Sequence, residues 1–345
     1  MCARMSEDDA EIAERLAART LELVDVASES RDEAALAAHV AAVLGARDLG
    51  DHCLLAGPED APILLAGHLD TVPTQGNRPG RRDGERVHGL GASDMKGALA
   101  VMMELVLAGS PYGALFFPRE ELPAAESALA PLLERHLLRP DLALVMEPTD
   151  NTIHAGCVGN INAAWTFHGV SGHSARPWTA DNAIEHAGRG IVHLAGHDPA
   201  AHEFDGLTFM EVASVTRISG GIAMNVIPDA AECHVNFRYS PGRRPDEAEA
   251  RLVELTGGHG ELRIDSNAPS GAVCVSHPLA ARLIEEAGLE VAPKQAWTPV
   301  AEFTAAGLAA INFGPGAPAQ AHRRDESIEI AALVRSYRVL EAFTA

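Results

Sequence analysis

The sequence predicts a two-domain α/β protein, in which a mostly parallel sheet with helices on both faces is interrupted by an inserted α+β domain. The chain has 345 residues, which is long for one compact core. Short apolar runs alternate with helical patterns up to about residue 160 and again after residue 268, whereas single apolar residues alternate with polar ones between them. We therefore expect a larger domain in two parts, residues 1–160 and 269–345, and an insert of residues 161–268.

The helices and strands expected in the larger domain are distinguished by the spacing of their apolar residues. Helices are predicted where apolar residues recur at helical spacing, over residues 7–26, 31–44, 95–108, 126–138, 278–287 and 328–344. Buried strands are predicted where short runs are continuously apolar, over residues 63–66, 114–117, 142–146 and 309–313. Residues 74–86 are rich in glycine, arginine and polar side chains, so we expect a loop there.

The insert follows a different order of elements. Its predicted strands cover residues 162–169, 211–218, 232–239 and 261–265, and its predicted helices cover residues 182–194 and 246–255. This β-α-β-β-α-β order is typical of a small domain with an antiparallel sheet.

Composition excludes several classes of protein. Acidic residues outnumber basic ones by 48 to 27, and no basic stripe is present, which excludes a nucleic-acid partner. No apolar run reaches the roughly 18 residues of a membrane helix, and the N-terminus lacks the apolar core of a signal peptide. We expect a cytoplasmic protein that starts at Met1 or at Met5. The five cysteines are scattered without a C-x-x-C pair, which argues against a disulfide framework and a thiolate metal site.

Candidate site residues follow the predicted strands. His68 and Asp70 come after the first strand, the paired Glu120 and Glu121 after the second, and Glu147 after the third. In open α/β sheets, ligands bind outside the carboxyl ends of the strands, so these side chains are expected to meet.

Asp94 and His322 extend this set. Asp94 follows a glycine-rich turn at the start of a helix, and His322 lies in a turn-rich segment after the last predicted strand. Each residue alone has an ordinary explanation, as a helix cap or a loop side chain, but together the histidines and carboxylates suit a pair of Zn²⁺ ions. Co²⁺ and Mn²⁺ are alternatives.

Six motifs in this order resemble the M20 metallopeptidase family. They are Gly67–Pro73, Gly91–Gly97, Glu120–Glu121, Glu147–Thr149, Ser171–Ala175 and Ala321–His322. The resemblance covers nearly the whole chain. It implies a zinc-dependent exopeptidase-like catalytic domain, with the insert acting as a dimerisation and lid domain in a homodimer.

The resemblance also implies a role for each metal-site residue. His68 and Glu147 would bind one zinc ion, Glu121 and His322 the other, and Asp94 would bridge them. Asp70 would orient the His68 ring, and Glu120 would be the general base.

Further roles are implied for substrate recognition. His173 resembles a histidine that reaches the active site of the partner subunit. Asn225 and Arg238 resemble substrate-contacting positions, and Arg176 and Gly314 are further candidates for binding the substrate.

Five further segments narrow the resemblance within the family: Gly172–Trp178, Asn182–Ile184, Asn225–Pro228, Asn236–Pro241 and Asn312–Gly316. They are most similar to the enzymes, particularly the actinobacterial type, that hydrolyse N-succinyl-LL-2,6-diaminopimelate to succinate and LL-2,6-diaminopimelate. Arg119, Pro299 and Glu302 depart from that pattern. Another M20 deacylase, such as an acetylornithine deacetylase, an aminoacylase or a carboxypeptidase, is therefore an alternative for this small-molecule hydrolase. A non-catalytic, metal-dependent ligand-binding protein is more remote, because binding alone does not need Glu120.

Overall fold

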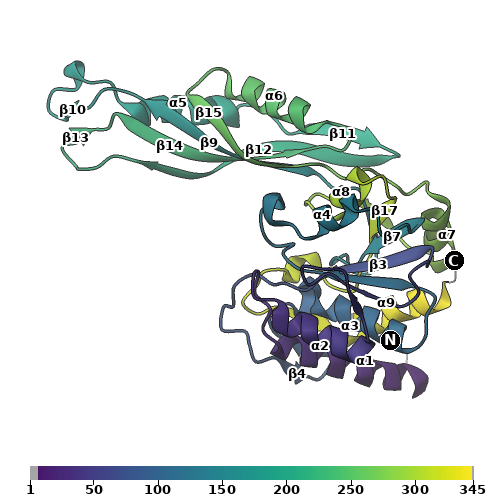
Figure 1. The fold of residues 1–345 in the computed structure, drawn as a ribbon. Helices are drawn as coiled ribbons and strands as arrows, with labels where there is room; N and C mark the ends of the chain where they lie inside the picture. The colour runs from purple at the N-terminus through teal and green to yellow at the C-terminus, as the bar shows by residue number, and fades with distance from the viewer. Residues whose placement is uncertain (1–6, 344–345) are drawn as a thin grey trace, which may run out of the picture. The chain divides into compact units, whose positions relative to one another are not determined.

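The computed structural model describes residues 7–343, so the alternative start at Met5 lies outside the described residues. The chain divides into two compact units (Figure 1). Unit 1 comprises residues 1–156, 272–292 and 298–345, and unit 2 comprises residues 157–271 and 293–297. The sequence placed the insert at residues 161–268. Among the described residues, no helix is long and apolar enough to cross a membrane.

Unit 1 is built on an eight-stranded sheet in the order β1-β2-β6-β3-β7-β17-β8-β16. Its four central strands are parallel to one another: β6 (Gly113–Phe117), β3 (Ile63–His68), β7 (Leu142–Val145) and β17 (Ala310–Asn312). The flanking strands are β1 (Arg47–Asp48), β2 (Leu54–Ala56), β8 (Ile153–Ala155) and β16 (Val291–Pro293). Every residue of β3, β6 and β7 is buried, as expected of strands covered on both faces.

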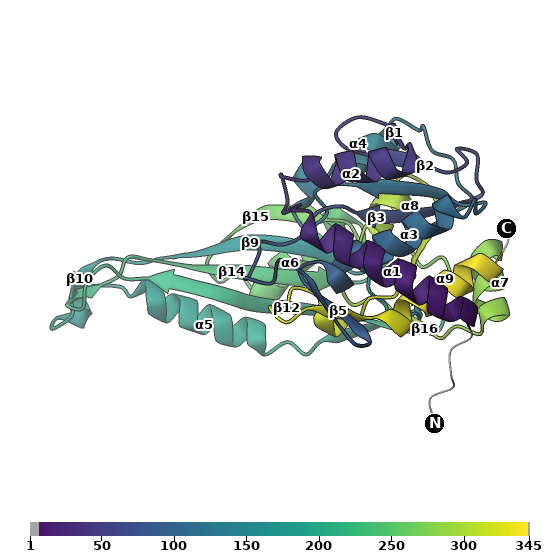
Figure 2. The same cartoon turned by 90° about the horizontal axis from the view of Figure 1, so that it is seen from below.

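Helices cover both faces of this sheet, as the sequence predicted (Figure 1). On one face, α1 (Glu7–Asp25), α3 (Gly97–Leu107) and α9 (Ile330–Ala342) lie side by side (Figure 2). On the other lie α4 (Leu129–Glu134) and α8 (Val300–Ala305). The remaining helices are α2 (Ala34–Leu44) and α7 (Pro278–Ala287). Helix α3 packs closely against the end of β3. A Cβ on Gly67 would lie 2.6 Å from Cδ2 of Leu99.

Unit 2 has a five-stranded antiparallel sheet in the order β11-β12-β14-β9-β15. The strands are β11 (Ala200–Phe204), β12 (Leu207–Gly220), β14 (Ala230–Tyr239), β9 (Gly159–His168) and β15 (Glu261–Ala268). Helices α5 (Ala183–Ala195) and α6 (Pro245–Thr256) pack on it around the buried rings of Trp165 and Phe237. A short ribbon, β10 (Gly172–His173) paired with β13 (Val226–Ile227), lies at one end (Figure 1).

Two predicted elements were wrong in part. The predicted loop of residues 74–86 contains β4 (Arg81–Asp83), which with β5 (Arg86–His88) and β18 (Ser327–Glu329) forms a small sheet. The exposed polar side chains of β4 carry no apolar period by which it could be recognised. The predicted helix of residues 126–138 is shorter, because the hydroxyl of Ser127 accepts the Leu129 N–H at its start and His136 takes a left-handed φ of 51° beyond its end.

Candidate metal centre

The imidazole of His68 lies at the centre of the candidate site. His68 ends β3 and is buried at the carboxyl end of the parallel strands. Its Nε2 lies 3.2 Å from Oδ1 of Asp94 and 3.9 Å from Oε1 of Glu147. Its Nδ1 lies 2.9 Å from the backbone oxygen of Asp70. The ring is therefore held on one edge by backbone and faces carboxylates with the other, as metal-binding histidines commonly do.

The carboxylate of Asp70 holds the backbone of the paired glutamates. Asp70 is fully buried, and its Oδ1 lies 3.6 Å from Nδ1 of His68, further than the backbone oxygen. The two carboxylate oxygens accept the N–H groups of Glu120 at 2.9 Å and Glu121 at 3.0 Å. The hydroxyl of Ser30 donates to the same carboxylate at 2.8 Å. The resemblance implies that Asp70 orients the His68 ring, which stays a prediction, and the hydrogen bonds of this carboxylate hold the loop that follows β6.

His322 approaches the same carboxylates from the C-terminal segment. Its Nε2 lies 2.9 Å from Oε1 of Glu121 and 3.6 Å from Oδ2 of Asp94. The other oxygen of Asp94 faces His68, so Asp94 lies between the two imidazoles. His322 has a φ of 61°, a left-handed backbone conformation that residues other than glycine rarely adopt.

The side chains form two overlapping groups that could hold a metal ion. Within each group, the possible ligand atoms all lie within 4.8 Å of one another. The groups are His68 with Glu120 and Glu147, and His68 with Asp94 and Glu121. His322 joins the second through Glu121 and Asp94. The structure thus brings together all six side chains expected here, and it places Glu120, the expected base, among the expected ligands.

The electrostatics of this cluster fit divalent cations. Burial raises the pKa of Glu120 well above its ordinary value, and the neighbouring carboxylates raise it further. Burial lowers the pKa of His68, but the hydrogen bond to Asp94 and the nearby negative charges raise it well above 6.5. The hydrogen bond to Glu121 raises the pKa of His322 to about 9. These shifts reflect an excess of negative charge that cations would compensate, and the imidazole and carboxylate donors suit Zn²⁺, Co²⁺ or Mn²⁺.

The turn from Gly314 to Gly316 packs against the strand end that carries Glu147. A Cβ on Gly314 would lie 2.4 Å from the backbone oxygen of Glu147, and a Cβ on Gly316 would lie 2.1 Å from that of Ser93. Both positions therefore need glycine, because backbone atoms cannot move aside as a flexible side chain can. Gly314, which the sequence proposed for substrate binding, is buried in this contact.

The remaining substrate-binding candidates lie in unit 2, in two separate places. His173 pairs with Val226 in the β10–β13 ribbon, where the Ser174 N–H donates to the backbone oxygen of Asn225 at 3.0 Å. The Arg176 N–H donates to the backbone oxygen of His173, and the side chains of His173, Arg176 and Asn225 are exposed. Arg238 instead lies near the far end of β14, where its Nε donates to Asn236 at 2.9 Å.

Two of the departures from the family pattern have structural roles. Arg119, with a φ of 63°, pairs with Asp51 and donates from Nε to the backbone oxygen of Glu126 at 2.9 Å. It thus braces the loop that carries the paired glutamates. Burial raises the pKa of Glu302 to about 7, while hydrogen bonds from Ser127 and Ala130 oppose the shift.

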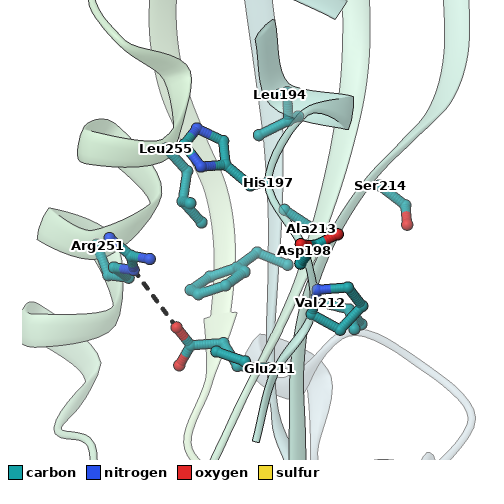
Figure 3. A pocket seen from close by; sticks show the side chains of 12 residues that line it. Leu194, His197, Asp198, Glu211, Val212, Ala213, Ser214, Arg251 and Leu255 are labelled. Atoms are coloured by element: carbon teal, nitrogen blue, oxygen red, sulfur yellow. Dashed lines mark ion pairs between the residues drawn. The ribbon is translucent and has the colours of Figure 1, made fainter. Parts of the chain in front are cut away.

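Unit 2 also contains a cavity of about 180 Å³ (Figure 3). Glu211 lines it and is nearly fully buried, with its carboxylate 3.0 Å from Nε of Arg243 and 3.5 Å from Nε of Arg251. Because two guanidinium groups already pair with this carboxylate, and none of the predicted site residues lines the cavity, the metal centre remains the stronger candidate site.

Sequence reasoning missed two residues that hold the site. Ser30 lies just before the predicted helix of residues 31–44 and donates to Asp70. Glu326 accepts backbone hydrogen bonds from the segment that carries Asp94. The only signals were a serine in a polar run and an acid four positions after His322, and neither tells which backbone groups lie opposite.

Comparisons with known proteins show the family to which the chain is similar. The model of peptidase family M20/M25/M40 matches residues 64–345. A Mycobacterium tuberculosis protein provisionally named succinyl-diaminopimelate desuccinylase is 37% identical over 341 residues, covering 94% of this chain and 96% of its own length. The succinyl-diaminopimelate desuccinylase of Corynebacterium glutamicum is 36% identical over 295 residues, covering 80% of each chain.

The fold is shared with solved structures. The chain superposes on a tripeptidase of Staphylococcus aureus with a TM-score of 0.76, at 19% identity, covering 95% of this chain and 97% of that one. At this identity the likeness shows the fold alone, and it confirms the predicted fold class.

Replacing Asp70 by Asn should destabilise the protein. Asn offers one acceptor oxygen, and its NH₂ group would face one of the two backbone donors. A buried donor left unpaired costs about 1–3 kcal/mol, so we expect the free energy of unfolding in EDTA to fall by that amount in urea titrations.

Ser30→Ala is the matched control, because it removes one donor to the same carboxylate and keeps both backbone bonds. It should cost about 1 kcal/mol. An Asp70→Asn loss no larger than that of Ser30→Ala would contradict the role of Asp70 in holding the loop.

Proposed function

The chain belongs to peptidase family M20/M25/M40, and we propose that it hydrolyses the amide of N-succinyl-LL-2,6-diaminopimelate to succinate and LL-2,6-diaminopimelate. The observation that carries the hydrolytic part is the grouping of Glu120 with two histidines and three further carboxylates at one end of the sheet. The choice of acyl group is supported by the names of the relatives that cover most of the chain.

Two divalent cations, Zn²⁺ with Co²⁺ or Mn²⁺ as substitutes, fit the donor set. His68 and Glu147 would hold one, Glu121 and His322 the other, and Asp94 would lie between them, in keeping with its contacts to both imidazoles. Bound there, such cations supply Lewis acidity that polarises an acyl carbonyl and lowers the pKa of water.

Glu120 is suited to moving the proton. Its backbone is fixed by Asp70, and its carboxylate lies in the group that contains His68 and Glu147. In the proposed reaction Glu120 takes a proton from the water that attacks the acyl carbon. It then gives the proton to the amine nitrogen as the carbon–nitrogen bond breaks.

The substrate-binding candidates of unit 2 support a site completed by a second copy of the chain. Asn225 lies just before β13, which precedes the Ala230 end of β14, whereas Arg238 lies eight residues along β14. Eight residues of antiparallel strand span about 27 Å, too far for both side chains of one copy to hold the same small substrate.

The exposed end of unit 2 supports the same arrangement. Near His173, the apolar side chains of Trp178, Ile222 and Met224 are 79%, 89% and 104% exposed. Large apolar groups gathered on a surface commonly mark a protein interface. We propose that this end meets a second copy in a homodimer, with His173 donating to the oxyanion of that copy's substrate. Arg238 and Arg176 would bind the substrate carboxylates.

Steady-state kinetics test the acyl specificity. We expect the full chain with added Zn²⁺ to cleave N-succinyl-LL-2,6-diaminopimelate with a kcat/KM at least about tenfold above that for N-acetylornithine or other N-acyl amino acids. The rate is measured from the loss of amide absorbance. A preference for N-acetylornithine would assign the chain to another deacylase activity. Zn²⁺ binding without hydrolysis of any of these compounds would favour the non-catalytic alternative.

Glu120→Gln should remove turnover and leave metal binding intact. A general base contributes about 10²–10⁴-fold, so kcat should fall by at least about 100-fold, while bound zinc measured by atomic absorption stays at the wild-type ratio. Glu121→Gln is the contrasting variant and should lower the bound zinc. If Glu120→Gln lost one equivalent of zinc, Glu120 would be a ligand and not the base.

A mixing experiment tests whether His173 acts on a second copy. His173→Ala and Glu120→Gln should each be inactive alone. In a mixed dimer, one site combines an intact Glu120 with an intact His173 of the other copy, so mixing should restore about a quarter of the wild-type activity. Absence of recovery in mixed dimers verified by ultracentrifugation would rule out the shared site.

A further inference from the structure

Glu326 is a buried carboxylate that the proposed reaction does not use. It lies four residues after His322 and immediately before β18, and it is 2% exposed. A carboxylate in such a position is costly unless its oxygens are hydrogen-bonded.

The hydrogen bonds that Glu326 accepts come from the segment that carries Asp94. Its Oε2 accepts the N–H of Gly91 at 3.0 Å, and its Oε1 accepts the N–H groups of Ser93 and Asp94, each at 2.9 Å. Its backbone oxygen also accepts the N–H of Gly89 at 3.0 Å. One residue thus holds four backbone donors along the six residues 89–94.

Three of these donors point at the two oxygens of the Glu326 side chain. Only a carboxylate can accept hydrogen bonds on both sides in this way. A carboxylate offers acceptors on both oxygens, whereas an amide of the same size turns a donor toward one side. The same segment needs help to keep its shape, because Asp94 and Met95 depart from helical backbone angles within the turn Ala92–Lys96.

A second tie joins the same segments, so folding does not depend on Glu326 alone. The Ser93 hydroxyl donates to the backbone oxygen of Ala317 at 3.1 Å and accepts the Ala317 N–H at 2.9 Å. Losing the carboxylate of Glu326 would therefore release the backbone at Asp94 while the segment stays attached at Ser93.

We propose that Glu326 is a positioning residue that sets the affinity of the metal centre for divalent cations. It does so by fixing the backbone of Asp94 against the segment that carries His322, so that the two ligands keep their spacing. The inference rests on the proposed metal site.

The test is titration of the metal-free full chain with Co²⁺. Binding is measured from the visible absorption of the bound ion. Groups that hold a ligand from behind typically change metal affinity by 10–100-fold, so we expect Glu326→Gln to raise the dissociation constant for Co²⁺ by about that factor. Glu326→Asp keeps the charge and both oxygens on a shorter side chain and should fall between Glu326→Gln and the wild type.

Glu302→Gln is the matched control, because it also neutralises a buried carboxyl, one that is hydrogen-bonded to Ser127 and Ala130. Its Co²⁺ affinity should stay within about twofold of wild type, and urea unfolding in EDTA will show how far each variant is destabilised.

The outcomes separate this inference from the proposed function. If the wild type bound no Co²⁺, the metal site itself would be wrong. If the wild type bound Co²⁺ and Glu326→Gln bound it equally well, or if Glu302→Gln lost as much affinity, the positioning role would be overturned. If Glu326→Gln does not fold, Glu326→Asp decides, and wild-type affinity in that variant would overturn the role.

Discussion

The carboxylate of Asp70 is the constraint on which the rest of the centre depends. Fully buried, it accepts the N–H groups of both glutamates that follow β6 and the hydroxyl of Ser30. Asp70 follows β3, the strand that ends at His68, and it therefore fixes the loop that follows the neighbouring strand β6. The fold gives the candidate ligands a common edge of the sheet, but only such side-chain contacts set their positions within hydrogen-bonding distance of one another.

The sheet and the contacts around the loops together explain how several carboxylates are held close to one another. The carboxylates that face the imidazoles repel one another, and the sheet cannot relax to separate them because its central strands are buried. Unfavourable backbone conformations are tolerated on either side, with positive φ at Arg119 and at His322. Arg119 is braced by Asp51 and Glu126, so surrounding contacts compensate for the backbone strain.

The sequence predicted the fold class and the side chains that meet at the sheet edge because both follow from local pattern. Apolar runs mark the strands, and His68, Glu121 and Glu147 stand where such runs end. The roles of Ser30 and Glu326 could not be predicted, because they depend on which backbone donors from distant segments lie opposite. The separation of Arg238 from His173 was missed for a similar reason, since it follows from the length and register of β14.

Two of the three departures from the family pattern, Pro299 and Glu302, are explained in part by packing. Pro299 stands at the start of α8, where its restricted φ suits a helix beginning. Glu302 lies within that helix and is hydrogen-bonded to Ser127 and Ala130, and its pKa of about 7 keeps much of it neutral near pH 7. In a chain with a formal charge of −21, attraction of an acyl group that carries a free carboxylate would depend on local cations, and Arg238 and Arg176 are the side chains that we propose for this.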